Sequence, residues 1–445
     1  MVMNIAIIDL KITITATARC HLIAFYKQKR SLFGTIHFDY NFYKKFVKRF
    51  VVAIMTSLHT SILKILWKTP QSLAELERIT PVSLPTLRKA VQELTEERWI
   101  RVVGQADAKG GRPAMLFGID NRRYVVIGVH IQLPGLRLIA THLDGQVIHQ
   151  EALFEKTKPS PREVMEAIQT YIATVQVRFP NQEIVGIGIA APGYTHPLTG
   201  DIISVGRVPS WQDFPICQRL RDTLGLPVVI ANDVDCMAFA EFHESGKSFA
   251  DNLIFVGLDE GVKISMFLNG ALYKGSFGNA GLIRAHFLNV PEPVGQNLEE
   301  MMAISGINRI FEELVAGLPT AEQERYADLL TLSHRQRLRS MLKADHLDLP
   351  VCVSVMQQLN AVLAAAIANI IYIIQPDHVV IGGMLSAMSP TAFSNLRNEV
   401  YAYLPDLFAN HVNIQQSQFH SPNTSALGAA YHLIEDLVFA EPSPI

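Results

Sequence analysis

From Tyr124 to the C-terminus, short apolar runs alternate with segments of helical periodicity, and this alternation constrains the fold most strongly. The run 184–190 is continuously apolar, as strands buried on both faces of a sheet are. Helical periodicity extends across 161–179 and 351–374. Asp144 and Gly145 form a turn dipeptide after a pair of strands that read as a hairpin. Strands joined by crossover helices predict an α/β body of two lobes.

The segment before this body, residues 56–120, has the order of elements typical of a winged helix. Three short helical segments come first, and Ser72 and Ser83 stand where N-caps of the second and third are expected. Glu75 lies three residues after Ser72, which is the spacing of a capping box. Two short apolar strands then flank the glycine-rich basic loop 109–113. Three helices followed by a β-hairpin predict a winged helix-turn-helix domain.

The third helix of this segment carries the residues that we expect to meet DNA, because the second helix of a helix-turn-helix lies in the major groove. Its buried face is predicted from the i, i+4, i+7 spacing of Leu87, Val91 and Leu94. The other face then presents the predicted DNA-binding residues Thr86, Arg88, Lys89 and Gln92, with Arg112 at the tip of the wing. Arg and Lys bind phosphates or guanine edges, and Gln reads adenine. The alternative is a three-helix domain with a solvated basic side.

The net charge of −2 conceals a basic N-terminal part and an acidic remainder. Residues 1–123 carry 20 Lys and Arg against 9 Asp and Glu, whereas the rest carries 19 against 32. A basic head on an acidic body favours a polyanionic partner for the head. Taken alone, the charge is equally compatible with a solvated basic surface.

The two ends of the chain carry little pattern. Residues 1–54 are basic and aromatic-rich without clear periodicity, and Met55 offers a second start. We expect 1–54 to be a poorly ordered arm, an artefact of start-codon choice, or a basic arm that touches the DNA backbone. Asp9 interrupts the apolar stretch near the start, which argues against a secretory signal. Residues 438–445 are expected to be a short tail.

Cysteine spacing and hydropathy indicate the compartment. The four cysteines are Cys20, Cys217, Cys236 and Cys352, with no paired spacing, so we expect neither a disulfide framework nor a cysteine-rich zinc site. No apolar run reaches the roughly 20 residues that a membrane-spanning helix needs. A cytoplasmic protein with no membrane partner is therefore predicted.

Six short motifs, taken in their order and spacing, resemble the ROK family of repressors, open reading frames and kinases. They are residues 187–193 (IGIAAPG), 200–203 (GDII), 231–235 (ANDVD), 270–275 (GALYKG), 376–383 (PDHVVIGG) and 426–430 (ALGAA). The resemblance implies an actin-like, ribonuclease H-like body over 121–437, of the sugar-kinase type. Its lobes would span about 121–231 and 232–437, with the C-terminal helix returning to the first lobe.

The two turns that hold phosphates in similar kinases are altered here. An Asp-x-Gly-Gly-Thr-like turn is replaced by residues 129–135, which lack the carboxylate and the paired glycines. The second turn, at 259–263, begins with Asp259 and Glu260, which would repel a polyphosphate, although Lys263 offsets part of that charge. Of the glycine-rich turns of similar kinases, only the pair on the adenosine side, Gly382 and Gly383, remains. ATP-dependent transfer is therefore not expected, and neither a catalytic residue nor a cofactor is predicted.

The sugar pocket is partly retained. By resemblance, Asn232 and Asp233 bind ligand hydroxyls, and Glu299 matches a further contact. The family's Glu and His in Gly-Glu-Ile-Gly-His are replaced by Leu282 and Ala285, with His286 one residue on. Arg284 would favour an anionic ligand, and Asn232 and Asp233 alternatively only cap the following helix. No metal is predicted, because the family's zinc cysteines are missing.

Together these patterns predict a DNA-binding transcriptional regulator, a repressor of carbohydrate-metabolism genes. Its partners would be a double-stranded DNA operator, a sugar or sugar phosphate, and a second copy of the chain in a homodimer or higher homo-oligomer. Two alternatives stay open: an active ATP-dependent sugar kinase with an accessory head, and a regulator that meets proteins and no small molecule.

Overall fold

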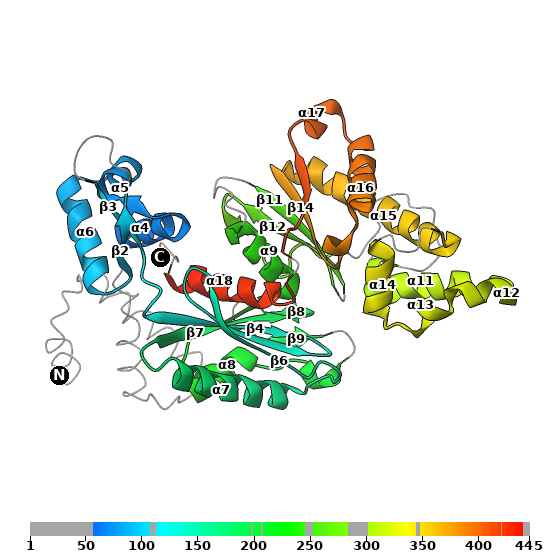
Figure 1. The fold of residues 1–445 in the computed structure, drawn as a ribbon, viewed down its shortest axis with the longest axis horizontal. Helices are drawn as coiled ribbons and strands as arrows, with labels where there is room; N and C mark the ends of the chain where they lie inside the picture. Colours follow the sequence, from blue (N-terminus) through cyan, green and yellow to red (C-terminus); the bar gives the residue numbers. More distant parts are fainter. Residues whose placement is uncertain are drawn as a thin grey trace. The chain divides into compact units, whose positions relative to one another are not determined.

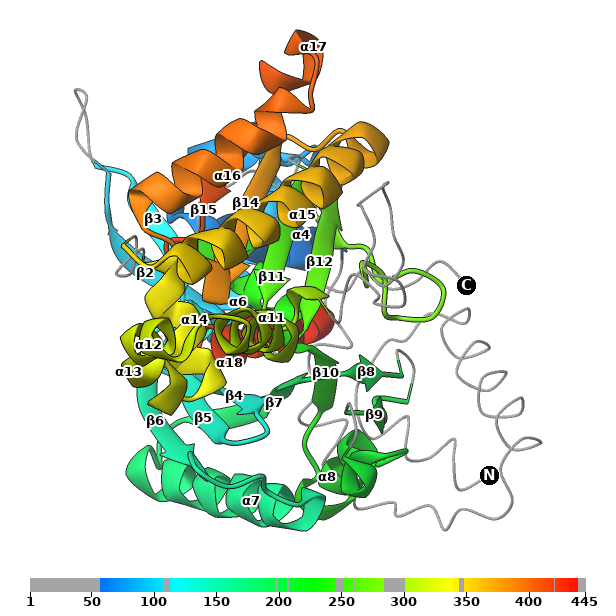
Figure 2. The ribbon, with the colours of Figure 1, turned by 90° about the vertical axis from the view of Figure 1, so that its right-hand side faces the viewer.

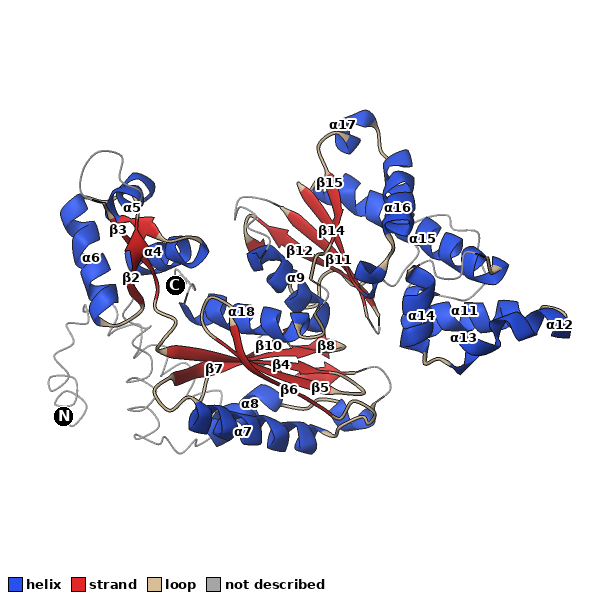
Figure 3. Ribbon diagram, in the orientation of Figure 1, coloured by secondary structure: helices blue, strands red, loops and turns tan. Residues whose placement is uncertain are grey.

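The computed structural model describes residues 57–106, 113–196, 199–205, 208–244, 252–259, 261–283, 301–343, 348–419 and 421–438. The expectations for the N-terminal arm and for the tail beyond Val438 lie outside these residues. Figure 1 shows the arrangement of the elements, and Figure 3 distinguishes helices from strands.

The first part of the described chain, which we call the head, has its elements in the predicted order. These are α4 (Ser57–Lys68), β1 (Gln71–Ser72), α5 (Leu73–Ile79), α6 (Leu84–Glu96), β2 (Ile100–Gln105) and β3 (Met115–Ile119). The three strands form one sheet in the order β1-β3-β2. Three helices are thus followed by a hairpin of β2 and β3, which pair antiparallel.

Local hydrogen bonds explain where the helices of the head begin. Ser72 caps α5, and Glu75 completes a reciprocal capping box, as predicted. Ser83 occupies the N-cap position of α6, but its side chain makes no cap hydrogen bond and instead contacts the Thr86 hydroxyl at 2.9 Å. Pro85 in the first turn of α6 leaves one fewer amide to satisfy there.

The first lobe of the body is built on a five-stranded sheet with the order β10-β7-β4-β5-β6. Its elements are β4 (Tyr124–Ile131), β5 (Leu136–Thr141), β6 (Val147–Leu153), α7 (Pro161–Arg178), β7 (Glu183–Ala191), α8 (Ile216–Leu224) and β10 (Val228–Asn232). β7 runs parallel to β4 and β10, and β4-β5-β6 is an antiparallel meander. A small pair, β8 (Tyr194–Thr195) and β9 (Ile202–Ser204), follows β7.

The second lobe is built on another five-stranded sheet, with the order β13-β12-β11-β14-β15. Its strands are β11 (Leu253–Leu258), β12 (Val262–Leu268), β13 (Ala271–Leu272), β14 (His378–Gly383) and β15 (Asn413–Gln416). The longer helices of this lobe are α11 (Ile304–Ala316), α14 (His334–Leu342), α15 (Pro350–Ile374) and α16 (Pro390–Ala402). Mixed sheets with crossover helices confirm the predicted α/β body of two lobes.

One helix, α15, is long and apolar enough to cross a membrane by length and composition. The sequence predicts this helix over 351–374 but not a candidate membrane span, because Gln357, Gln358 and Asn360 interrupt its apolar residues. Within its most apolar stretch 61% is buried, and many of its side chains belong to the core of the second lobe. Helices at the centre of a large core have this composition without any membrane.

Two helices lie between the sheets. α9 (Asp233–Glu244) contacts β11 and β12, and α18 (Thr424–Val438) packs on α9 and on β4, β7 and β10. The C-terminal helix therefore lies on the first sheet, opposite α7 (Figure 1, Figure 2). This close layering requires glycine: a Cβ on Gly188 would lie 1.8 Å from the Ala429 carbonyl oxygen, and one on Gly428 would lie 1.5 Å from that of Cys236.

Candidate functional site

In α6, the residues predicted to be buried and those predicted to be exposed are so in the structure. Leu87, Val91 and Leu94 are buried, together with Ala90. The predicted DNA-binding residues of α6, Thr86, Arg88, Lys89 and Gln92, are all exposed. Arg112, the predicted residue of the wing, lies outside the described residues.

Three of these exposed side chains contact other side chains of α6 or of its N-cap. Gln92 donates to the Glu96 carboxylate at 2.8 Å, and Lys89 lies 3.8 Å from the Glu93 carboxylate. Thr86 contacts Ser83. Contacts of this kind at exposed positions are weak, so they hold these side chains only loosely.

Asn232 and Asp233 lie at the junction between the lobes, where β10 ends and α9 begins. Both are buried, with 6% of each residue exposed. The amide of Val234 donates to Asn232 Oδ1 at 3.0 Å and to Asp233 Oδ1 at 2.9 Å. Asn232 Nδ2 donates to the Gly193 carbonyl at 3.1 Å. Capping of the helix, the alternative role, is thus one that both side chains perform here.

Asp233 belongs to a buried cluster that no motif in the sequence indicates. One ligand-type atom from each of His130, Asp233 and Asp259 lies within 4.8 Å of the other two. Burial and the nearby Asp259 carboxylate raise the pKa of Asp233 to about 7. Burial and the Arg335 guanidinium lower the pKa of His130 to about 3, so its imidazole is neutral at physiological pH. The sequence placed His130 and Asp259 in two turns far apart in the chain, and only the fold brings them together.

Two basic side chains near this cluster are already paired. Lys263 Nζ lies 2.5 Å from Asp235 Oδ2, and Ser265 donates to Asp235 Oδ1 at 2.6 Å. Arg335 forms an ion pair with Asp259. Because Lys263 is committed to Asp235, it offsets less of the negative charge around Asp259 than its place in the sequence suggested.

The other predicted ligand contacts, Arg284, His286 and Glu299, lie outside the described residues. Just before them in the chain, Asn279 lies in the segment after β13. Its side chain bonds to the backbone of Thr195 in the first lobe. Its Oδ1 accepts from the Thr195 amide at 3.2 Å, and its Nδ2 donates to the Thr195 carbonyl at 3.0 Å. These two hydrogen bonds join β8 of the first lobe to the segment that precedes the predicted ligand contacts.

The head contacts the body through Trp67 of α4. Its indole Nε1 donates to the Leu143 carbonyl at 2.5 Å. Its ring lies 4.6 Å from the ring of His243 and 5.4 Å from that of Tyr431, measured between centroids. His243 is in the last turn of α9, whose first residue is Asp233. One helix therefore connects the Asn232–Asp233 junction with the head.

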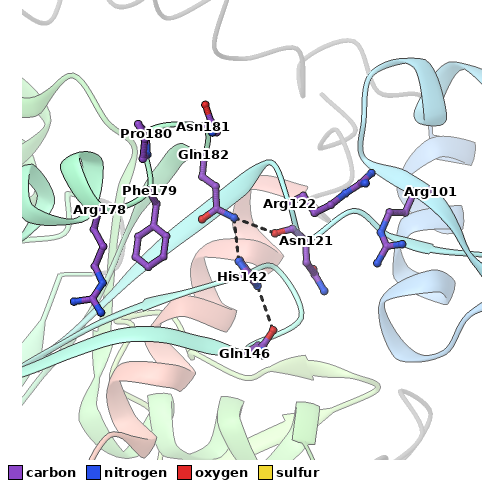
Figure 4. Close-up of a pocket in the computed structure, with 10 residues that line it drawn as sticks. All are labelled: Arg101, Asn121, Arg122, His142, Gln146, Arg178, Phe179, Pro180, Asn181 and Gln182. Carbon is purple, nitrogen blue, oxygen red and sulfur yellow. Dashed lines mark hydrogen bonds between the residues drawn. The ribbon is translucent and has the colours of Figure 1, made fainter.

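A cavity of about 540 Å³ lies where the head joins the first lobe, and it does not include Asn232 or Asp233. Figure 4 shows its polar lining, from which Arg101 and Arg122 project on the head side. Arg122 donates to both Asp120 oxygens, at 2.8 and 2.9 Å, and Arg101 lies 3.7 Å from the same carboxylate. Asp120 therefore offsets part of the positive charge of this cavity, which Arg178 also lines.

Two lobes of mixed sheet, with a polar junction at the start of α9, define the class of α/β proteins that includes sugar kinases. The sequence profile of the ROK family matches residues 126–436, which is more than half of the chain. The chain therefore belongs to the ROK family.

The relatives include repressors and kinases. The xylose repressor of Bacillus subtilis is 22% identical over 84% of this chain and 93% of its own length. A beta-glucoside kinase of Listeria innocua is 26% identical over 58% of this chain and 81% of its own length. The kinase match thus leaves out much of the chain that the repressor match covers.

Solved structures show the same fold. A ROK family transcriptional regulator, described as a homologue of the Escherichia coli Mlc protein, has a TM-score of 0.69 and 20% identity over 86% of this chain and 96% of its own. A ROK family glucokinase of Streptomyces griseus, in complex with glucose and AMPPNP, has a TM-score of 0.56 and 20% identity over 69% of this chain and 98% of its own.

Proposed function

We propose that this protein is a cytoplasmic DNA-binding transcriptional regulator that represses carbohydrate-metabolism genes, with a body that senses a sugar or sugar phosphate. The observation that carries the proposal is the exposed face of α6, with Arg88, Lys89 and Gln92, in a head that precedes a ROK body. Match lengths support it, because the repressor relatives extend over the head as well as the body. Domain boundaries at about 56–120 and 121–437 are part of this proposal.

The direct test is selection of genomic DNA fragments by the purified full-length protein at a fixed salt concentration, since non-specific binding depends strongly on salt. We expect enrichment of a few sites with two-fold symmetry, because a homodimer presents two equivalent heads. Lack of enrichment over fragments recovered without protein would contradict the proposal.

The effector is proposed to bind at the lobe junction, where Asn232 and Asp233 would contact its hydroxyls. Binding there would favour one closure of the lobes, provided that the ligand has different affinities for the two states. The start of α9 would respond first, and its last turn carries His243, which packs against Trp67 of the head. A change in the closure of the lobes would in this way change the placement of the head.

A Trp67→Ala variant should separate ligand binding from the DNA response. We expect D-xylose, D-glucose or one of their phosphates to raise the melting temperature of wild type and to weaken its binding to DNA. The variant should show the same shift in melting temperature but at least about 10-fold less change in DNA affinity, a loss within the usual coupling range. Fluorescence anisotropy of a labelled DNA site, titrated with and without the sugar, measures the DNA affinity of wild type and of the variant.

Tyr403→Ala, which removes an exposed aromatic side chain of the second lobe, is the matched control and should respond as wild type does. If Trp67→Ala responds fully, the coupling does not pass through this contact. Failure of every sugar and sugar phosphate to shift the melting temperature would instead favour a regulator that meets protein partners.

Kinase activity is the rival function that the kinase relatives raise. Phosphate transfer needs an arrangement that stabilises negative charge, whereas Asp233 and Asp259 bring two carboxylates to the same buried place. In a coupled assay with ATP and a panel of sugars, we expect wild type to turn over no faster than Asp233→Asn. A wild-type rate that exceeds the variant by 100-fold or more would establish the kinase.

A further inference from the structure

The cluster of His130, Asp233 and Asp259 joins three separate elements. His130 lies near the end of β4, Asp233 begins α9, and Asp259 follows β11 directly. All three are buried, and one nitrogen or oxygen atom of each lies within 4.8 Å of the others. An imidazole and two carboxylates are ligands typical of divalent transition metals.

Among the residues that the structure describes, the charges at this place are not fully paired. Arg335 pairs with Asp259, and Lys263 pairs with Asp235. Asp233 forms no ion pair with any other described residue, although it is 6% exposed. A buried carboxylate that is bonded to an amide but has no cationic partner is unfavourable unless it takes up a proton or a cation.

His130 provides an independent indication. Its Nδ1 is buried and has no hydrogen-bond partner in the described part of the chain, and the whole residue is 2% exposed. Buried polar atoms are nearly always satisfied, so an unsatisfied nitrogen on an imidazole of this cluster calls for a missing partner. A cation accepts electron pairs from both kinds of group.

We propose that His130, Asp233 and Asp259 bind a divalent first-row transition metal ion, of the Zn²⁺ or Mn²⁺ class, between the two lobes. Bonds of about 2.0–2.2 Å at tetrahedral angles place paired ligand atoms about 3.3–3.6 Å apart, so a contraction of at most about 1.5 Å completes the site. The imidazole favours these ions over Ca²⁺ and Mg²⁺, which prefer all-oxygen sites.

Such an ion would connect the end of β4, the central strand of the first sheet, to the end of β11 in the second. It would neutralise Asp233 and hold the start of α9 in place. The absence of thiolates excludes only a cysteine site and does not bear on this one. The proposal goes beyond the proposed function, because a regulator and a kinase could both be stabilised by such an ion.

The test uses the full-length protein stripped of metal with a chelator and titrated with Co²⁺, whose visible absorption reports inner-sphere ligands. We expect wild type to bind one equivalent more than His130→Ala or Asp233→Asn, or to bind that equivalent at least 10-fold more tightly. Elemental analysis after dialysis against Zn²⁺ should give the same difference in stoichiometry. Zn²⁺ should also raise the melting temperature of wild type and not that of the variants.

His411→Ala and Asp222→Asn are the matched controls, since both change exposed residues far from the cluster in the fold. They should bind Co²⁺ as wild type does. Asp233→Asn preserves the oxygen that accepts from the Val234 amide, and circular dichroism confirms that a variant is folded. Equal binding by wild type and the cluster variants, or no tight binding by wild type, would overturn the proposal.

Discussion

Replacing Arg88 and Lys89 together by Ala will weaken specific DNA binding by at least about 30-fold while leaving the protein folded. Both side chains are exposed on α6, and the buried face of that helix, Leu87, Val91 and Leu94, is untouched. A good contact to a base edge contributes about 1–3 kcal/mol, so losing two costs about 2–6 kcal/mol. The lower value already corresponds to about 30-fold in affinity. Anisotropy titrations of a selected site at fixed salt measure the loss.

The control removes the same charge elsewhere. Lys156 and Lys158 are exposed on the first lobe, and Lys156→Ala with Lys158→Ala lowers the net charge by the same amount. We expect this control to bind the selected site within about 3-fold of wild type, because its charges act only over distance. If both double variants lose affinity equally, α6 does not provide the specific contacts.

Gly428→Ala will destabilise the body more than any exposed substitution, although it adds only one methyl group. The Cβ would lie 1.5 Å from the carbonyl oxygen of Cys236 and 2.4 Å from its carbonyl carbon. Both are backbone atoms of α9, so no side chain can rotate away and the two helices must separate. Overpacking typically costs about 1–3 kcal/mol, and we expect the upper end or more here. The midpoint of urea unfolding, followed by circular dichroism, reports it.

Gly104→Ala is the matched control, because nothing lies within 4 Å of the Cβ it would add. Its unfolding midpoint should stay within experimental error of wild type. If Gly428→Ala unfolds at the same midpoint, then α9 and α18 are not packed as closely as the structure has them. The effect should also appear as a loss of the coupling between ligand and DNA, since α9 links the two sites.

Local patterns in the sequence were sufficient for many elements. Ser72 and Glu75 predicted the start of α5, and the i, i+4, i+7 spacing predicted the buried face of α6. The spacing of Leu76 and Ile79 predicts that both face the buried side of α5, but Ile79, at the end of this seven-residue helix, is 56% exposed. Short elements depend on their neighbours, which a local pattern does not contain.

The sequence indicated only some of the residues that the structure brings together at the lobe junction. Asn232 and Asp233 were singled out by a motif, and the structure places both at the lobe junction, where they also bond the start of α9. The sequence indicates His130 and Asp259 only as parts of the two altered phosphate turns. Their contact with Asp233 depends on the alignment of β4, β11 and α9, which no spacing along the chain encodes.

The sequence by itself determined the α/β class, the order of helices and strands in the head, and the motifs of the ROK family. These follow from periodicity, capping and short motifs, all of which act within a few residues. Only the tertiary structure decided that α9 runs from Asp233 to the contact with Trp67, and that His130, Asp233 and Asp259 share one buried place. Burial, ion pairing and close helix packing depend on which distant segments meet, and that is settled only when the two sheets and the helices between them pack together.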